Sequence, residues 1–174
     1  MIEKNKLPDF DGTTAFNGGL RFFDSSNDEW KQIWGKDFGS LMPEIKIFAA
    51  DAFGTIYGLD SNNEVVIFWP ETAELESLEV GVGEFYEMIA ADPVNTINLD
   101  LFNSCVEEYG RPLINENFAF KIETALGGEL SVGNISIMNA ADHYKLLGKI
   151  AAQIKDIPEG TIIDNLLIEK IKNS

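Results

Sequence analysis

The chain has 174 residues, of which 45% are hydrophobic and 24% are charged, a composition typical of a globular domain. Its 29 Asp and Glu against 13 Lys and Arg give a net charge of −16, which excludes a protein that grips nucleic acid or an anionic membrane by its phosphates. A single cysteine excludes an internal disulfide, and no apolar run reaches the roughly 18 residues of a membrane span. We therefore expect a cytoplasmic protein without a signal peptide and with one domain over residues 1–174.

The N-terminal part of the chain has weak patterns. Residues 1–27 are rich in turn-forming residues and predict an irregular segment or a short hairpin. Residues 26–39 predict a short helix, because Trp30, Ile33 and Trp34 form one apolar stripe at helical spacing.

Four strands separated by turn residues come next, a pattern typical of an antiparallel meander. They cover residues 44–53, 55–60, 64–70 and 73–80. Asn62 and Asn63 suit the positive φ of a tight turn between two of these strands. In the last strand Glu74 and Glu76 share a face, because strand side chains alternate. We therefore expect the sheet to bury one face and to expose an acidic one.

Two amphipathic helices are predicted after the strands, over residues 83–91 and 98–109. In the first helix the periodicity places Met88 toward the core, together with the neighbouring apolar residues, and turns Glu84 and Glu87 outward.

The C-terminal part predicts strands near 118–122 and 135–138 and then a long amphipathic helix over 139–154. Gly148 weakens this helix, so we expect a close neighbour at that position. Residues 156–174 predict a docked C-terminal helix or a tail. The elements together indicate an α+β fold, with an antiparallel meander sheet of about four to six strands packed against C-terminal amphipathic helices.

Residues suited to catalysis or metal binding are scarce. His143 is the sole histidine, and its place on the long helix predicts a surface or half-buried side chain. Cys105 lies on a predicted helix and is expected in the core, where free cysteines usually lie. One His and one Cys are too few for a zinc site, and the acidic turn 60–64 lacks the spacing of a calcium loop. We therefore predict no catalytic, cofactor-binding or metal-ligating residue.

The acidic residues are concentrated in one stretch. Between Lys46 and Arg111, 64 consecutive residues hold 13 Asp and Glu and no Lys, Arg or His. A field of this sign attracts a basic partner and speeds its association. The alternative interpretation is that the charge serves only solubility.

Two segments resemble known families. FAADAFGTIYGLDSNNEVVIFWPETAELESL resembles the central hairpins of the SUKH superfamily, where an Asp-x-Phe-Gly turn precedes a strand with Trp or Phe. ALGGELSVGNISIMNAADHYKLLGKIAAQI resembles the C-terminal part of type VI secretion DNase-immunity proteins, where Leu-Gly-Gly precedes a strand with Asn and a final helix. The matching positions here are Leu126, Gly127, Gly128, Asn134 and the helix from Asn139. The resemblance implies a compact bacterial immunity domain without a shared catalytic motif, which occludes a toxin, often a basic nuclease.

We therefore expect a non-catalytic immunity protein that neutralises a basic toxin of the nuclease class by electrostatic steering and occlusion. The acids expected to contact this partner are Glu74, Glu76, Glu79, Glu84, Glu87 and Asp92. Exposed ion pairs contribute little each, so aromatic or aliphatic anchors are expected as well. One alternative is a regulatory or scaffold domain of the same fold. Another is a cofactor-independent enzyme, which a pocket with converging carboxylates would favour.

Overall fold

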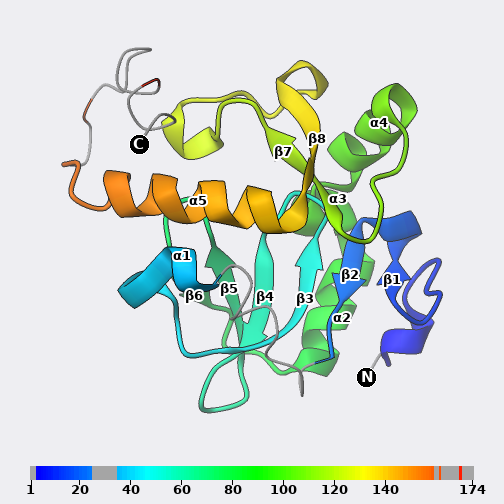
Figure 1. The fold of residues 1–174 in the computed structure, drawn as a ribbon. Helices are drawn as coiled ribbons and strands as arrows, with labels where there is room; N and C mark the ends of the chain where they lie inside the picture. The colour runs from blue at the N-terminus through cyan, green and yellow to red at the C-terminus, as the bar shows by residue number, and fades with distance from the viewer. Residues whose placement is uncertain (1–2, 25–34, 159–160, 162–168, 170–174) are drawn as a thin grey trace.

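The structure, a computed structural model, describes residues 3–24, 35–158, 161 and 169. At its centre is an antiparallel sheet of six strands in the order β1-β2-β3-β4-β5-β6, so that strands adjacent in the sequence are adjacent in space (Figure 1). The strands are β1 Thr14–Ala15, β2 Leu20–Phe22, β3 Lys46–Asp51, β4 Ile56–Leu59, β5 Val65–Trp69 and β6 Glu74–Ser77. The predicted α+β fold with a meander sheet is thereby confirmed.

Helices and a smaller sheet surround the large sheet (Figure 1). The smaller sheet pairs β7 Glu116–Phe120 with β8 Ile135–Asn139. The α-helices are α1 Lys36–Phe38, α2 Val82–Ala91, α3 Pro93–Ile97, α4 Leu99–Tyr109 and α5 Ala140–Ile154. Short 3₁₀ turns lie at Lys4–Lys6, Phe16–Gly18, Gly39–Leu41, Thr124–Leu126 and Val132–Asn134. The three long helices and both strands of the smaller sheet lie where the sequence predicts them, apart from small shifts at their ends.

Both faces of the central strands are buried, because α2 covers one face and α5 the other, whereas the edge strand β6 is exposed throughout (Figure 1). On the first face Tyr57 of β4 packs in one cluster with Phe85 and Ile89 of α2. On the second face Phe68 of β5 packs in another cluster with Leu147 of α5. The prediction of an exposed acidic sheet face is therefore wrong.

The reason lies in the sequence of the central strands. β5 is apolar throughout, and β3 runs from Ile47 to Ala50 without a polar residue. A strand with a continuous apolar run is buried on both faces, whereas alternation would leave one face in water. Apart from Asp51, which is buried at the end of β3, the acids of the cation-free stretch lie on turns, on the edge strand β6 and on the outer sides of helices.

The N-terminal segment belongs to the large sheet. β1 and β2 form a hairpin, and β2 pairs with β3 from Leu20 to Phe22. Leu20 is fully buried in the cluster beneath α2. Of the two alternatives expected for residues 1–27, an irregular segment or a short hairpin, the described residues thus contain the hairpin. Of the helix predicted over 26–39, the structure describes α1 and the turn after it, and the rest lies outside the described residues.

The connection between α2 and α4 differs from the prediction in two respects. Tyr86 lies in the core and Met88 is 40% exposed, because the buried stripe of α2 is centred between Phe85 and Tyr86. Pro93 follows α2 and begins α3, a short helix that the sequence patterns did not predict. Proline suits this first helical position because its missing N–H would have no helical partner there.

The Leu-Gly-Gly sequence and Asn134 build the loop between β7 and β8. Gly127 ends a 3₁₀ turn with φ of +86°, a conformation that favours glycine. A Cβ at Gly128 would lie 1.8 Å from the carbonyl oxygen of Ile122. The Asn134 side chain accepts a hydrogen bond from the Ile122 N–H at 3.0 Å and donates one to the Ile122 carbonyl at 2.8 Å. The motif therefore fixes the shape of this loop.

Helix α5 begins as predicted, with the Asn139 side chain accepting a hydrogen bond from the Ala141 N–H at 3.0 Å. A Cβ at Gly148 would lie 3.0 Å from the backbone oxygen of Asp37, which confirms the close neighbour expected there. Most of residues 156–174, with the predicted helix or tail, lie outside the described residues. Within the described chain, no helix combines the length and the apolar character needed to cross a bilayer.

Candidate interaction surface

The predicted partner-binding acids begin on the edge strand of the large sheet. Glu76 lies opposite Ile67, and Glu74 lies opposite Trp69. Paired residues of an antiparallel ladder point to the same face, and Ile67 packs into the cluster beneath α2. Glu74 and Glu76 are both exposed. They therefore point outward on the side of the sheet that α2 covers.

The remaining predicted acids follow along the same side. Glu79 is exposed in the connection from β6 to α2. Glu84 and Glu87 lie on the exposed side of α2. Asp92 caps α3 by accepting a hydrogen bond from the Asn95 N–H at 3.3 Å and is also exposed. The structure thus places all six acids along one path from β6 to the start of α3.

Sequence reasoning missed three further acids on α4. Asp100, Glu107 and Glu108 are exposed, on the polar side of a helix that buries Phe102 and Cys105. They belong to the same cation-free stretch, and the polar face of the predicted helix was the signal that could have found them. We use the term acidic surface for the exposed acids from β6 to α4, namely Glu74, Glu76, Glu79, Glu84, Glu87, Asp92, Asp100, Glu107 and Glu108.

Apolar side chains are exposed among these acids. Met88 of α2 is 40% exposed, Val94 of α3 is 41% exposed and Tyr109 of α4 is 37% exposed. Binding energy in protein interfaces comes mostly from a few such side chains that become fully desolvated. The acidic surface therefore carries both charges and candidate anchors.

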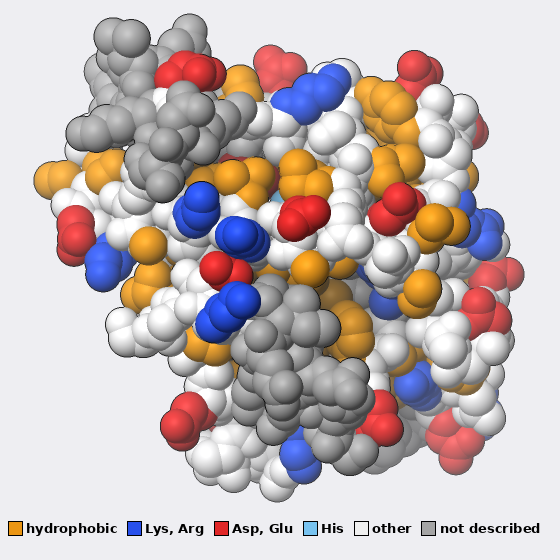
Figure 2. Space-filling view, in the orientation of Figure 1, with side chains coloured by type: hydrophobic (Ala, Val, Ile, Leu, Met, Phe, Trp, Pro, Cys, Tyr) orange, Lys and Arg blue, Asp and Glu red, His pale blue; other side chains and the backbone are white. Residues whose placement is uncertain are grey.

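Exposed lysines lie on the other side of the sheet. Lys36 of α1 and Lys145 and Lys149 of α5 are exposed. Figure 2 shows Lys and Arg side chains gathered over α1 and α5. The exposed lysines of α1 and α5 thus contrast with the cation-free stretch that carries the acidic surface.

A chain of buried polar side chains links β2 to α5. Arg21 donates to Asn117 Oδ1 at 2.5 Å, and Asn117 Nδ2 lies 3.0 Å from His143 Nδ1. Because Arg21 occupies the amide oxygen, the amide nitrogen of Asn117 donates to His143 Nδ1. The proton of the neutral imidazole is therefore on Nε2, which faces Glu123 Oε1 at 3.6 Å.

The prediction of a surface or half-buried His143 is wrong, because the side chain is fully buried. Helix α5 packs against β7 and β8 as well as the large sheet, so a second side of the helix is covered. The turn after β3 closes over the imidazole, and a Cβ at Gly54 would lie 3.2 Å from His143 Cε1. His143 therefore joins three parts of the fold and is shielded from water.

The Asp-x-Phe-Gly sequence forms that turn. Asp51 Oδ1 accepts hydrogen bonds from the N–H groups of Phe53 and Thr55, both at 2.9 Å, and Gly54 adopts φ of +101°. Burial of the carboxyl group raises the pKa of Asp51 to about 6. The motif is therefore explained by backbone geometry.

Other potentially reactive groups are placed as structural residues. Cys105 is fully buried, as predicted, and burial raises the pKa of its thiol, which disfavours the reactive thiolate. No group of three or more His, Cys, Asp or Glu within the described residues is arranged to hold a metal ion.

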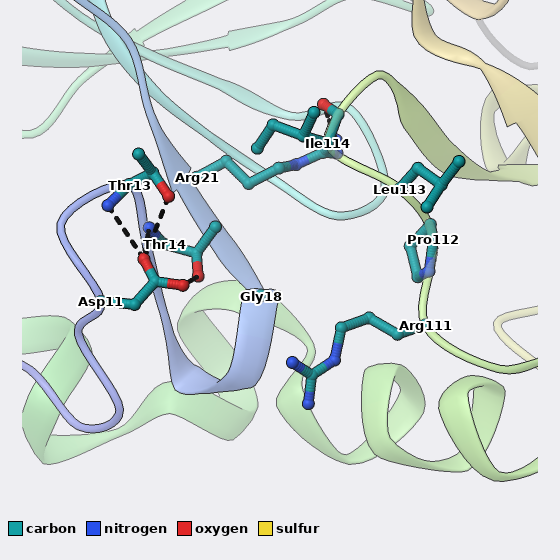
Figure 3. A pocket seen from close by; sticks show the side chains of 9 residues that line it. All are labelled: Asp11, Thr13, Thr14, Gly18, Arg21, Arg111, Pro112, Leu113 and Ile114. Carbon is teal, nitrogen blue, oxygen red and sulfur yellow. Dashed lines mark hydrogen bonds between the residues drawn. The ribbon is translucent and has the colours of Figure 1, made fainter.

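A pocket of about 420 Å³ lies between the β1–β2 region and the segment after α4. In Figure 3 the Asp11 carboxylate accepts hydrogen bonds from Thr13 and Thr14. These bonds hold the pKa of Asp11 well below its usual range. Arg21 donates to the carbonyl groups of Ile114 and Glu116 at the pocket edge. The pocket therefore offers no free acid–base pair.

Comparisons with known proteins bear on both the fold and the family. Residues 84–151, from α2 into α5, match the family described as T6SS immunity protein Tdi1, C-terminal. The crystal structure of Atu4351 from Agrobacterium tumefaciens is similar in fold, with a TM-score of 0.55 and 17% identity, over 76% of this chain and 67% of that chain. No curated protein matches the sequence. The part of the chain from α2 into α5 is therefore similar to type VI secretion immunity proteins, as the resemblance of its C-terminal segment predicted.

Proposed function

We propose that this protein is a cytoplasmic immunity protein that neutralises a basic toxin, of the nuclease class, by binding it. The observation that carries the proposal is the match of residues 84–151 to the immunity-protein family. The same match favours binding over catalysis, because an immunity protein acts on its toxin by association.

The acidic surface supports a basic partner. Nucleases grip phosphate through Lys and Arg, so their substrate-binding faces are positively charged. A protein whose own charge is −16 is complementary to such a face. An acidic surface placed over the nucleic-acid groove of the toxin would occlude it, since a standard interface covers about 800 Å² of each partner.

The proposed mechanism has two steps. Long-range attraction between the acidic surface and the toxin speeds the encounter, and this step weakens with salt because the screening length is about 8 Å at physiological ionic strength. Met88 and Val94, which are exposed among the acids, then become desolvated and slow dissociation. Charge therefore controls the association rate, and apolar contact controls the lifetime of the complex.

The test uses the purified product of the neighbouring gene as the candidate toxin, together with a variant in which Glu74, Glu76, Glu84 and Glu87 are changed to Lys. A matched control changes Glu3, Glu44, Glu129 and Asp156, also exposed acids, to Lys, with the same change in net charge. Stopped-flow association should slow by at least about tenfold in the first variant and clearly less in the control. Protection of DNA from the toxin should be lost in parallel.

Salt provides an independent test. The association rate of the unchanged protein should fall steeply between about 0.05 M and about 0.5 M salt, whereas the variant with four lysines should show little dependence. Equal slowing in both variants would mean that net charge alone matters. A fast, salt-independent association would contradict the proposed steering.

A further inference from the structure

A small cavity lies where the large sheet meets the smaller sheet and α5. Its volume is about 60 Å³. The side chains that matter in its lining are Trp69, Glu71, Phe120, Glu123 and Leu130. A cavity of this size holds a few water molecules or the tip of one side chain, and it is far smaller than the pockets that enclose whole ligands. The cavity is therefore too small to hold the substrate of the cofactor-independent enzyme that we considered as an alternative.

Glu123 lines this cavity, and its carboxyl group is incompletely paired on the side that faces His143. The residue is 5% exposed, and its Oε1 atom has no hydrogen-bond partner within the described residues. The nearest donor, His143 Nε2, lies 3.6 Å away, beyond a good hydrogen bond. Because Asn117 donates to His143 Nδ1, the atom of His143 that can donate toward Glu123 is Nε2. A buried carboxylate in this state is costly unless a donor reaches it.

Glu71 brings a second carboxyl group to the same cavity. It is partly buried in the turn between β5 and β6. Burial, together with the nearby negative charge of Glu123, raises the pKa of Glu71 to about 7. No Lys or Arg is among the described residues that line the cavity. The two carboxyl groups therefore lie close together without a cation.

Apolar and aromatic side chains form the rest of the lining. Leu130 is 63% exposed, and Phe120 and Trp69 are partly buried. The indole N–H of Trp69 donates to Glu76 Oε2 at 3.4 Å, so the cavity adjoins the acidic surface. An acidic interior with an apolar rim matches a side chain that has a cationic tip and an aliphatic stem.

We propose that this cavity receives one arginine side chain of the toxin, so that its guanidinium group lies between Glu71 and Glu123. The proposal rests on the proposed function, because the arginine belongs to the bound partner. Arginine fits better than lysine, since its planar guanidinium carries five N–H donors that pair with carboxylates and stacks on aromatic rings. The methylene stem would lie along Phe120 and Leu130.

The direct test needs no toxin. Methylguanidinium is titrated into the purified protein at constant ionic strength, and the indole N–H resonance of Trp69 is followed by NMR. We expect saturable binding with a Kd in the range of roughly 1–50 mM, as suits a ligand of few atoms. In Glu71→Gln binding should weaken by about tenfold, and Glu44→Gln, at an exposed acid away from the cavity, should bind as the unchanged protein does. Glu123→Gln should weaken binding by the same factor. If Glu123→Gln does not fold, because Glu123 is buried, Glu71→Gln alone decides the test.

Several outcomes would overturn the proposal. They are a shift that does not saturate, equal binding by Glu71→Gln, and ethylammonium binding as tightly as methylguanidinium. Tighter binding of calcium than of methylguanidinium would assign the cavity to a metal instead. With the toxin, Glu71→Gln should accelerate dissociation. Methylguanidinium binding without any toxin complex would leave the cavity valid and refute the proposed function, whereas a toxin complex unaffected by Glu71→Gln would refute the arginine alone.

Discussion

The two sides of the large sheet are built on different principles. On the α2 side the core is aromatic and dry, with the ring of Phe85 centred 4.9 Å from that of Tyr57 and 5.7 Å from that of Phe48. On the α5 side an apolar cluster gives way to the buried polar chain from Arg21 to Glu123. The outer surfaces differ as well, since acids cover α2 and lysines lie on α5.

The difference shows how stability and binding can be separated in one fold. Like charges on the acidic surface repel one another and oppose folding. Apolar burial beneath α2 requires no charged partner, so this helix can remain in place while its outer face carries only acids. The α5 side differs, because there α5, the smaller sheet and β2 of the large sheet must be held in fixed positions relative to one another. Directional hydrogen bonds between distant segments serve that purpose.

The largest effect should come from the dry side. Phe85→Ala removes a fully buried ring and should lower the free energy of unfolding by about 3–5 kcal/mol. Urea denaturation measures this change. Met88→Ala, on the same helix but 40% exposed, is the matched control and should cost less than about 1 kcal/mol. Similar losses in both variants would mean that α2 is not anchored by its aromatic stripe.

The polar side should be sensitive to a loss of hydrogen bonds without a loss of volume. Asn117→Leu keeps the branched shape and the number of heavy atoms of this buried side chain but leaves a donor of Arg21 and Nδ1 of His143 without their partner. We expect a loss of about 2–3 kcal/mol in the free energy of unfolding. Near-wild-type stability in this variant would show that the α5 side is held by apolar contacts after all.

A substitution at the contact between α5 and α1 should change the free energy of unfolding by a smaller amount, and the sign of the change is informative. In an exposed helix, Gly148→Ala would add up to about 1 kcal/mol of stability. Here the new Cβ would lie 3.0 Å from the Asp37 backbone oxygen, so α1 has to move away. We therefore expect a net loss of about 1–2 kcal/mol, measured by thermal or chemical unfolding. A stabilised variant would mean that α1 yields at little cost.

The sequence predicted the parts of this fold that depend on local signals. Turn residues mark the strands of the meander, and a spacing of three and four marks the buried residues of α2, α4 and α5. The burial of His143 depends on how α5 docks between two sheets, and Arg21 and Asn117 are 96 positions apart. No local pattern carries that information.

The acidic surface and the cavity show the same limit. The six predicted acids share one stretch of chain, so charge counting found them together, and the acids of α4 were missed although they lie in that stretch. Glu71 lies in the turn after β5 and Glu123 in the loop after β7. These two positions are far apart in the sequence, and both line the cavity only in the folded chain. In a sequence with many Asp and Glu, no pattern shows which two carboxyl groups are neighbours in the folded protein.

The smallest predicted effect concerns Glu71 and the pH dependence of stability. Its pKa is about 7 in the folded protein against an ordinary value of 4.5, so the folded state binds the proton more tightly than the unfolded state does. The stabilisation is fully present below about pH 4.5 and is lost as pH rises toward about 7. Because Glu71 is partly exposed to solvent, we expect this loss to be about 1 kcal/mol.

Glu71→Gln cannot titrate, so its unfolding free energy should fall less than that of the unchanged protein over the same interval. Asp51, whose pKa is also raised, remains in both proteins and cancels in the difference. Glu84→Gln, at an exposed acid of α2, should give a curve parallel to that of the unchanged protein. Urea denaturation at several pH values measures the three curves. If Glu71→Gln and Glu84→Gln gave the same pH dependence, the Glu71 carboxyl group would be as well solvated as that of Glu84. The two sides of the sheet would then not differ in the environment of their carboxyl groups.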